Sequence, residues 1–72
     1  MTTTSTTDPT ELQHCLANLK LERDAVQLYD ALGEMEKDPI RADAFRAIGS
    51  GERRHAIIWA SRVQACGEEV PP

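Results

Sequence analysis

Three residues that can bind a metal ion stand where apolar residues are expected. Glu52 and His55 form a Glu-x-x-His within one apolar helical stripe, and Glu22 interrupts a similar stripe earlier in the chain. On a helix, residues three apart lie on one face, one turn apart, so a carboxylate and an imidazole can reach the same ion. A carboxylate buried there without a partner costs several kcal/mol. The three residues therefore predict a metal site.

Two helices are expected to position these residues. Asp-Pro pairs at residues 8–9 and 38–39 each combine a capping aspartate with a proline suited to the first helical position. They predict helices over about 10–37 and 39–65, with no strand-like alternation to compete. Because no long loop separates them, we expect an all-α fold in which the helices form an antiparallel hairpin.

The hairpin brings the three residues to one level. Glu22 lies 16 residues before the turn at residue 38, and Glu52 and His55 lie 14 and 17 residues after it. At a rise of about 1.5 Å per residue, the three are level to within one turn. One chain offers two carboxylates and one imidazole, too few for a dinuclear site, whereas two chains related by a two-fold offer twice that set. Carboxylate with imidazole suits iron or manganese, with zinc as a substitute.

Each helix carries an apolar arc wider than one neighbouring helix can cover. A second stripe that includes Leu21, Leu28 and Met35 widens the first helix, and Ile40 and Ile58 widen the second. We therefore expect two hairpins to pair into a four-helix bundle. The main stripes are Cys15, Leu19, Glu22, Val26, Tyr29 and Gly33 in the first helix and Phe45, Ile48, Glu52, His55, Ala56, Trp59 and Val63 in the second.

The composition limits the classes of protein to consider. Of 72 residues, 40% are hydrophobic and 28% are charged, which indicates one small soluble domain that needs a metal or a second chain for stability. The net charge of −4 argues against a nucleic-acid partner. With no secretory signal or membrane-length apolar run, we expect a cytoplasmic protein. Cys15 and Cys66 are expected to be reduced thiols inside the helices.

The chain divides into three predicted parts. Residues 1–8 are a Thr/Ser-rich tail expected to be disordered, and residues 9–66 are the helical hairpin. Gly67 is a suitable helix-ending residue, and two prolines follow it. Residues 67–72 are therefore expected to be a flexible tail or a truncated linker.

The motif has a known counterpart. Residues 21–25, 28–29, 36–39, 45, 52–56 and 59 together resemble a half-size, rubrerythrin-like ferritin domain. The chain looks like both the N-terminal domain of vacuolar-iron-transporter-type membrane ferritins and the encapsulated ferritins, which are packed inside encapsulin shells. The resemblance covers roughly residues 11–66, and this sequence shows neither a membrane domain nor an extended cargo-targeting tail.

The resemblance implies a di-iron ferroxidase that oxidises Fe(II) with dioxygen between two chains, in iron storage or detoxification. Glu22, Glu52 and His55 are then the iron ligands and the catalytic residues, and Tyr29 and Trp59 stand next to them. The implied partners are a second copy at minimum, a larger ring of copies, and an encapsulin shell or a downstream membrane transporter domain.

Three other functions remain open at this point. The same ligands would serve a non-catalytic metal-sensing or metal-loading module for an iron transporter, which oxygen consumption after Fe(II) addition separates from a ferroxidase. A purely structural hairpin would dimerise without regard to metal or to Glu52. A rubrerythrin-like peroxidase is the weakest alternative because no rubredoxin-type cysteine pair is present.

Overall fold

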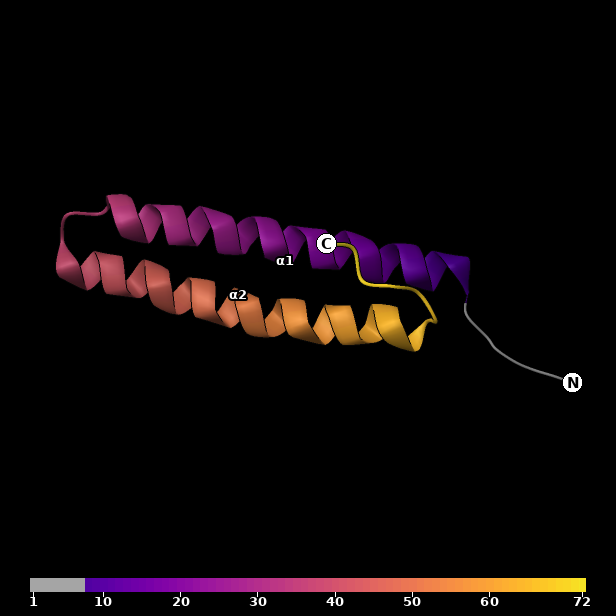
Figure 1. Ribbon diagram of the computed structural model, residues 1–72. Helices are drawn as coiled ribbons and strands as arrows, with labels where there is room; N and C mark the ends of the chain where they lie inside the picture. Colours follow the sequence, from indigo (N-terminus) through magenta and orange to yellow (C-terminus); the bar gives the residue numbers. More distant parts are fainter. Residues whose placement is uncertain (1–7) are drawn as a thin grey trace, which may run out of the picture.

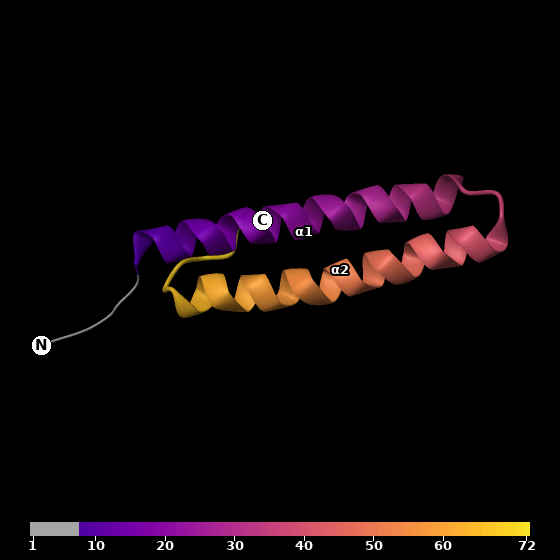
Figure 2. The same cartoon turned by 180° about the vertical axis from the view of Figure 1, so that it is seen from behind.

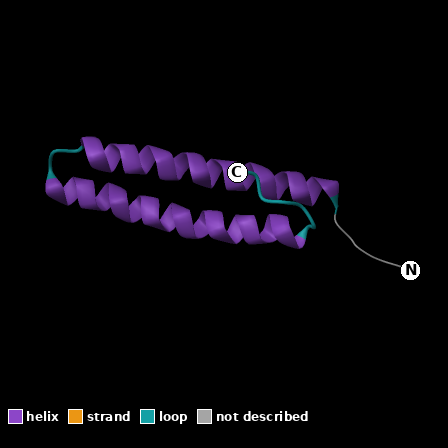
Figure 3. Cartoon of the chain, viewed as in Figure 1, coloured by secondary structure: helices purple, strands orange, loops and turns teal. Residues whose placement is uncertain are grey.

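Two antiparallel helices make up almost all of the computed structural model, which describes residues 8–72 (Figures 1 and 3). Helix α1 spans Pro9–Met35 and helix α2 spans Pro39–Ala65, each with 27 residues. Within residues 8–72 there is no strand, so the predicted all-α hairpin is confirmed. Pairing into a four-helix bundle stays a prediction. The predicted disordered tail lies outside the described residues, apart from Asp8.

Both helices begin at the predicted Asp-Pro pairs. The Asp8 carboxylate accepts a hydrogen bond from the Thr10 backbone N–H at 3.0 Å. The Asp38 carboxylate accepts one from the Arg41 N–H at 3.1 Å. Each aspartate has extended backbone angles and is followed by proline at the first helical position. The side chains satisfy N–H groups that have no partner within the helix, which fixes where each helix starts.

Helix α1 ends two residues before the predicted end at Lys37. Glu36 is the C-cap, with φ −74° and ψ 125°, and its N–H still donates to the Leu32 carbonyl at 3.0 Å. The Glu36 carboxylate then accepts from the Asp38 N–H at 3.1 Å. Asp38 is also biased toward extended backbone angles, because it precedes Pro39. The connection between the helices, residues 36–38, is therefore two residues longer than the predicted helix bounds imply.

The helices meet along a seam with alternating spacings of three and four residues, the spacing of a coiled coil. Leu19 and Val63 are the most deeply buried large side chains, at 2% and 0% exposure. Burying such a side chain contributes about 1.5–3 kcal/mol. We call this contact the seam; its positions are Leu12, Cys15, Leu19, Glu22, Val26, Tyr29 and Gly33 in α1 and Ala42, Phe45, Gly49, Glu52, Ala56, Trp59 and Val63 in α2.

Near the turn, glycines bring the helices together. A Cβ atom on Gly33 would stand 3.0 Å from Arg46 Cγ, and one on Gly49 would stand 3.1 Å from Asp30 Oδ1. Both glycines are buried, so α1 and α2 contact through backbone at this end. The main apolar cluster lies at the other, open end and is built around Cys15, Leu19 and Val63.

Gly67 ends α2 as predicted. Its φ of 86° lies in the left-handed region that favours glycine. The Gly67 N–H donates to the Gln64 carbonyl at 2.9 Å, and the Glu68 N–H donates to the Val63 carbonyl at 3.3 Å. This pair of bonds is a Schellman motif, which satisfies carbonyl groups at the helix end and reverses the chain direction.

After this reversal the C-terminal segment runs back toward α1 (Figures 1 and 2). Val70 packs against the apolar cluster, and Arg23 Nη1 donates to the Pro71 carbonyl at 2.7 Å. The sequence of residues 67–72 predicts a flexible tail or a truncated linker. In the structure the segment lies against the hairpin because Val70 and Pro71 both find partners on it.

Neither α1 nor α2, the two helices of residues 8–72, combines the length and the apolarity needed to cross a membrane.

Replacing the cap at Asp38 tests how the second helix is fixed. Asp38→Ala is expected to lower the free energy of unfolding by about 1 kcal/mol because the Arg41 N–H loses its acceptor. Asp38→Asn keeps a capping oxygen and should remain close to the original protein. Urea denaturation followed by circular dichroism measures both, and equal losses in the two variants would contradict the capping role.

Candidate metal site

Glu22, Glu52 and His55 converge in the structure as the sequence predicts. His55 Nδ1 lies 3.2 Å from Glu22 Oε2 and 3.3 Å from Glu52 Oε1. One donor atom from each of the three residues lies within 4.8 Å of the others. The two carboxylates are largely buried, with side chains 18% and 23% exposed, and the imidazole is 56% exposed.

The seam explains why the carboxylates fit between the helices. Glu22 and Glu52 both occupy seam positions, so their side chains point toward the opposite helix. The seam neighbours of Glu52 on α2 are Gly49 and Ala56. Both residues are small and leave room for a carboxylate. His55 stands beside the seam, one turn after Glu52, and reaches both acids from the edge.

These distances suit a shared metal ion. Ligand atoms that bind one transition-metal ion at about 2.1 Å stand about 3 Å apart, close to the separations of His55 Nδ1 from the two carboxylates. The donor set of two carboxylates and one imidazole suits iron, manganese or zinc. A neutral imidazole has one N–H, so Nδ1 cannot donate fully to both acids, and a cation would satisfy all three groups.

Each site residue also lies near the centre of its helix. Thirteen residues of α1 precede Glu22 and thirteen follow it. Glu52 divides α2 in the same way. A two-fold axis through the site would therefore superimpose two hairpins along their full length, with neither end left overhanging.

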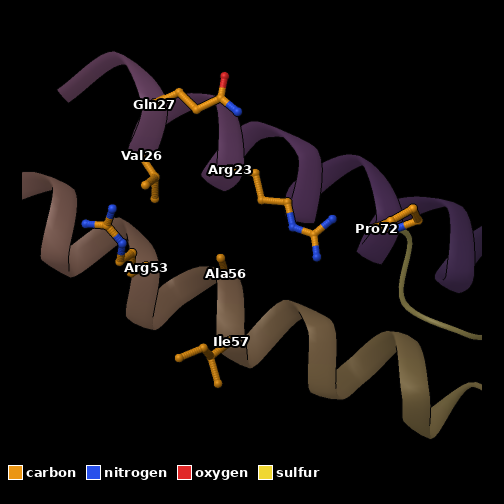
Figure 4. Close-up of a pocket in the computed structure, with 7 residues that line it drawn as sticks. All are labelled: Arg23, Val26, Gln27, Arg53, Ala56, Ile57 and Pro72. Carbon is orange, nitrogen blue, oxygen red and sulfur yellow. The ribbon is translucent and has the colours of Figure 1, made fainter. Parts of the chain in front are cut away.

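Two different faces flank the seam. On one, which we call the arginine face, Arg53 pairs with Asp30 and Arg46 donates to the Gly33 carbonyl at 3.3 Å. The C-terminal segment lies on this face: Pro72 lines a groove with Arg23 and Arg53, as Figure 4 shows. This face is covered by ion pairs and by the chain itself.

The other face holds the exposed edge of the site. His14 stacks on Trp59 there, with ring centroids 6.5 Å apart. Leu21, Leu28 and Met35 follow His14 at intervals of seven residues, which keeps them on nearly the same side of α1. In α2, Ile48 precedes His55 by the same interval. We call this surface the apolar face; the large apolar side chains exposed on it or on the adjoining outer sides of the helices are Leu21 (66%), Leu28 (54%), Met35 (76%), Ile40 (80%), Ile48 (45%) and Ile58 (49%).

The two aromatic residues predicted to support the ligands lie near the site but contact other groups. The Tyr29 ring is tilted against Phe45, with centroids 6.2 Å apart. Trp59 lies between His14 and Arg62, whose guanidinium carbon stands 4.7 Å from the ring centroid. A supporting role for Tyr29 and Trp59 stays a prediction. His14 is exposed and stacks on Trp59, a contact that the sequence does not predict because it depends on the relative rotation of the helices.

Arg53, within the Glu-x-x-His motif, points away from the site and pairs with Asp30 of the other helix. Both of its terminal guanidinium nitrogens contact the carboxylate, and Nη1 lies 3.2 Å from Asp30 Oδ1. Its side chain is 54% exposed, so the pair contributes at most about 1 kcal/mol.

No known family model, curated protein or solved structure matches this chain.

Removing one seam carboxylate tests the electrostatics of the metal-free site. Glu52→Gln is expected to raise the free energy of unfolding by up to about 1 kcal/mol, because it relieves repulsion between two partly buried carboxylates. Glu34→Gln, at an exposed position away from the site, is the matched control and should change little. Denaturation in the presence of a metal chelator measures both. A clear loss of stability in Glu52→Gln alone would show that the carboxylates are not in conflict.

Proposed function

We propose that two copies of this hairpin bind transition-metal ions between them and that, with Fe(II) as substrate, the pair acts as a ferroxidase that uses dioxygen. The observation that carries the proposal is the convergence of Glu22, Glu52 and His55 within 4.8 Å at the middle of both helices. The resemblance of the same residues to a ferritin-like motif supports this choice of chemistry.

Three observations support a second copy as the partner. One chain supplies three donor groups, and the imidazole is more than half exposed on the apolar face. Six large apolar side chains are exposed on that face or on the adjoining outer sides of the helices. The central position of the site lets a two-fold axis bury this face along the whole hairpin. The completed set would be four carboxylates and two imidazoles in a four-helix bundle.

The chain's own residues have distinct tasks in this proposal. Glu22 and Glu52 supply hard oxygen ligands that favour the higher oxidation state of iron. His55 supplies nitrogen from the edge of the seam, where it lies beside the Glu52 carboxylate of the same Glu-x-x-His. The apolar face excludes water from the site once two copies pair. Iron itself supplies the redox chemistry.

Loss of any one ligand is expected to abolish the activity. Glu22→Ala, Glu52→Ala and His55→Ala should each reduce oxygen uptake after Fe(II) addition to the rate of buffer alone, with helix content nearly intact, because a two-fold removes the ligand twice. Metal-dependent thermal stabilisation should vanish with it. The measurements are oxygen uptake per iron and melting temperature with and without metal. Glu34→Ala, outside the site, should keep both.

The outcomes separate the alternatives. Metal binding without oxygen uptake in the original protein would indicate a sensing or loading module. A folded dimer indifferent to metal would indicate a structural hairpin. Full activity of Glu22→Ala would exclude α1 from the site and refute the ligand set.

A charge placed on the apolar face is expected to block pairing. Leu28→Lys should give a monomer with reduced metal binding, because burying an ammonium group between the copies is unfavourable. Ile57→Lys is the matched control: Leu28 and Ile57 are both apolar and more than half exposed, but Ile57 lines the groove on the arginine face. Light scattering at matched concentrations, with and without Zn(II), measures the mass. Pairing that survives Leu28→Lys but is lost in Ile57→Lys would place the interface on the arginine face and contradict this prediction.

A further inference from the structure

The two cysteines lie together at the open end of the hairpin. Cys15 occupies a seam position of α1, is 4% exposed, and belongs to the apolar cluster that contains Val63. Cys66 follows Val63 by three residues, the next step of the seam, and is partly buried. No disulfide joins them in the structure of residues 8–72, and Cys66 is the C-cap of α2, just outside the helix in which it was predicted.

The thiols contact one another from well-fixed backbone positions. The Cys66 side chain hydrogen-bonds the side chain of Cys15. The Cys66 N–H is held by the Arg62 and Val63 carbonyls, each at 3.1 Å, and the Schellman motif at Gly67 fixes the chain that follows. Cys15 lies within a continuous helix.

We propose that Cys15 and Cys66 form an intramolecular disulfide that clasps the open end of the hairpin, with a hydroperoxide such as hydrogen peroxide as the oxidant. The peroxide oxygen is transferred to the Cys66 sulfur, the more exposed of the two, to give a sulfenic acid and one water. The Cys15 sulfur then attacks the Cys66 sulfur, the S–S bond forms, and a second water leaves. The two thiols lose two electrons in total, and the peroxide gains them.

This site does not depend on the proposed metal chemistry. Cys15 lies two helical turns from Glu22, about 10 Å along α1. The bond would link the start of α1 to the end of α2 and so close nearly the whole hairpin into one loop. A cross-link of this kind stabilises chiefly by restricting the unfolded chain, and the effect grows with loop length.

The surroundings of Cys66 set the pH dependence of the reaction. Desolvation, the neighbouring Cys15 thiol and the Glu11 carboxylate raise the pKa of Cys66 above its usual value. Cys15 and Glu11 both come from α1, which packs against the end of α2. Because the thiolate is the reactive form, oxidation should be slow at neutral pH and faster as the pH rises toward the raised pKa.

The test uses the full chain, reduced and then treated with stoichiometric hydrogen peroxide in the presence of a metal chelator. We expect the intact mass to fall by two hydrogen atoms per chain and a tryptic digest to contain peptides 1–20 and 63–72 joined. The oxidised chain should migrate as a monomer in a non-reducing denaturing gel. Its melting temperature should rise by about 10 °C and return on reduction.

Two variants act as controls. Cys66→Ser changes the more exposed thiol and should fold normally, yet show neither the joined peptides nor the thermal shift on oxidation. Cys15→Ala, which keeps the buried position apolar, should behave in the same way. Disulfides between chains, a sulfinic acid at Cys66 with Cys15 still open to alkylation, or joined peptides without thermal stabilisation would each overturn the proposal. None of these outcomes bears on the proposed metal binding by Glu22, Glu52 and His55, which is tested separately.

Discussion

Two carboxylates packed into the contact between α1 and α2 are the constraint on which the rest of the hairpin depends. Glu22 and Glu52 lie in the seam with less than a quarter of each side chain exposed, where an unpaired charge is unfavourable. Within the described residues both carboxylates find one partner, the imidazole of His55, and that ring nitrogen serves two acceptors. The demand for positive charge at this point exceeds what one chain provides, and a metal cation would meet it.

The same constraint gives the two faces of the hairpin different roles. The arginine face carries contacts made within one chain, because Arg53 and Arg46 find Asp30 and Gly33 there and the C-terminal segment lies along its groove. The apolar face has no such cover from residues 8–72, and the imidazole edge of the site opens onto it. A partner that covered the apolar face would also close the site, which is why we treat pairing and metal binding as one event.

The local features of the fold could be read from the sequence, and the contacts between distant segments could not. The Asp-Pro caps and Gly67 act on their own helix ends, so their positions followed directly from residue type. The common level of Glu22, Glu52 and His55 followed from the constant rise of a helix. The stacking of His14 on Trp59 depends on helix rotation, however, and the Cys66–Cys15 contact depends on how closely the helix ends approach. Neither quantity has a signature in residue spacing.

The placement of the site along the seam bears on how metal and folding are coupled. Apolar packing of Leu19 and Val63 holds the open end, and backbone contact at Gly33 and Gly49 holds the turn end. The middle of the seam contains the carboxylates, which contribute little apolar burial. An ion bound there would join the two helices where apolar packing joins them least, and its binding free energy would add to the free energy of folding, because an unfolded chain cannot gather the ligands. In a chain this short, with its main apolar cluster at one end, that contribution becomes a large share of the total stability.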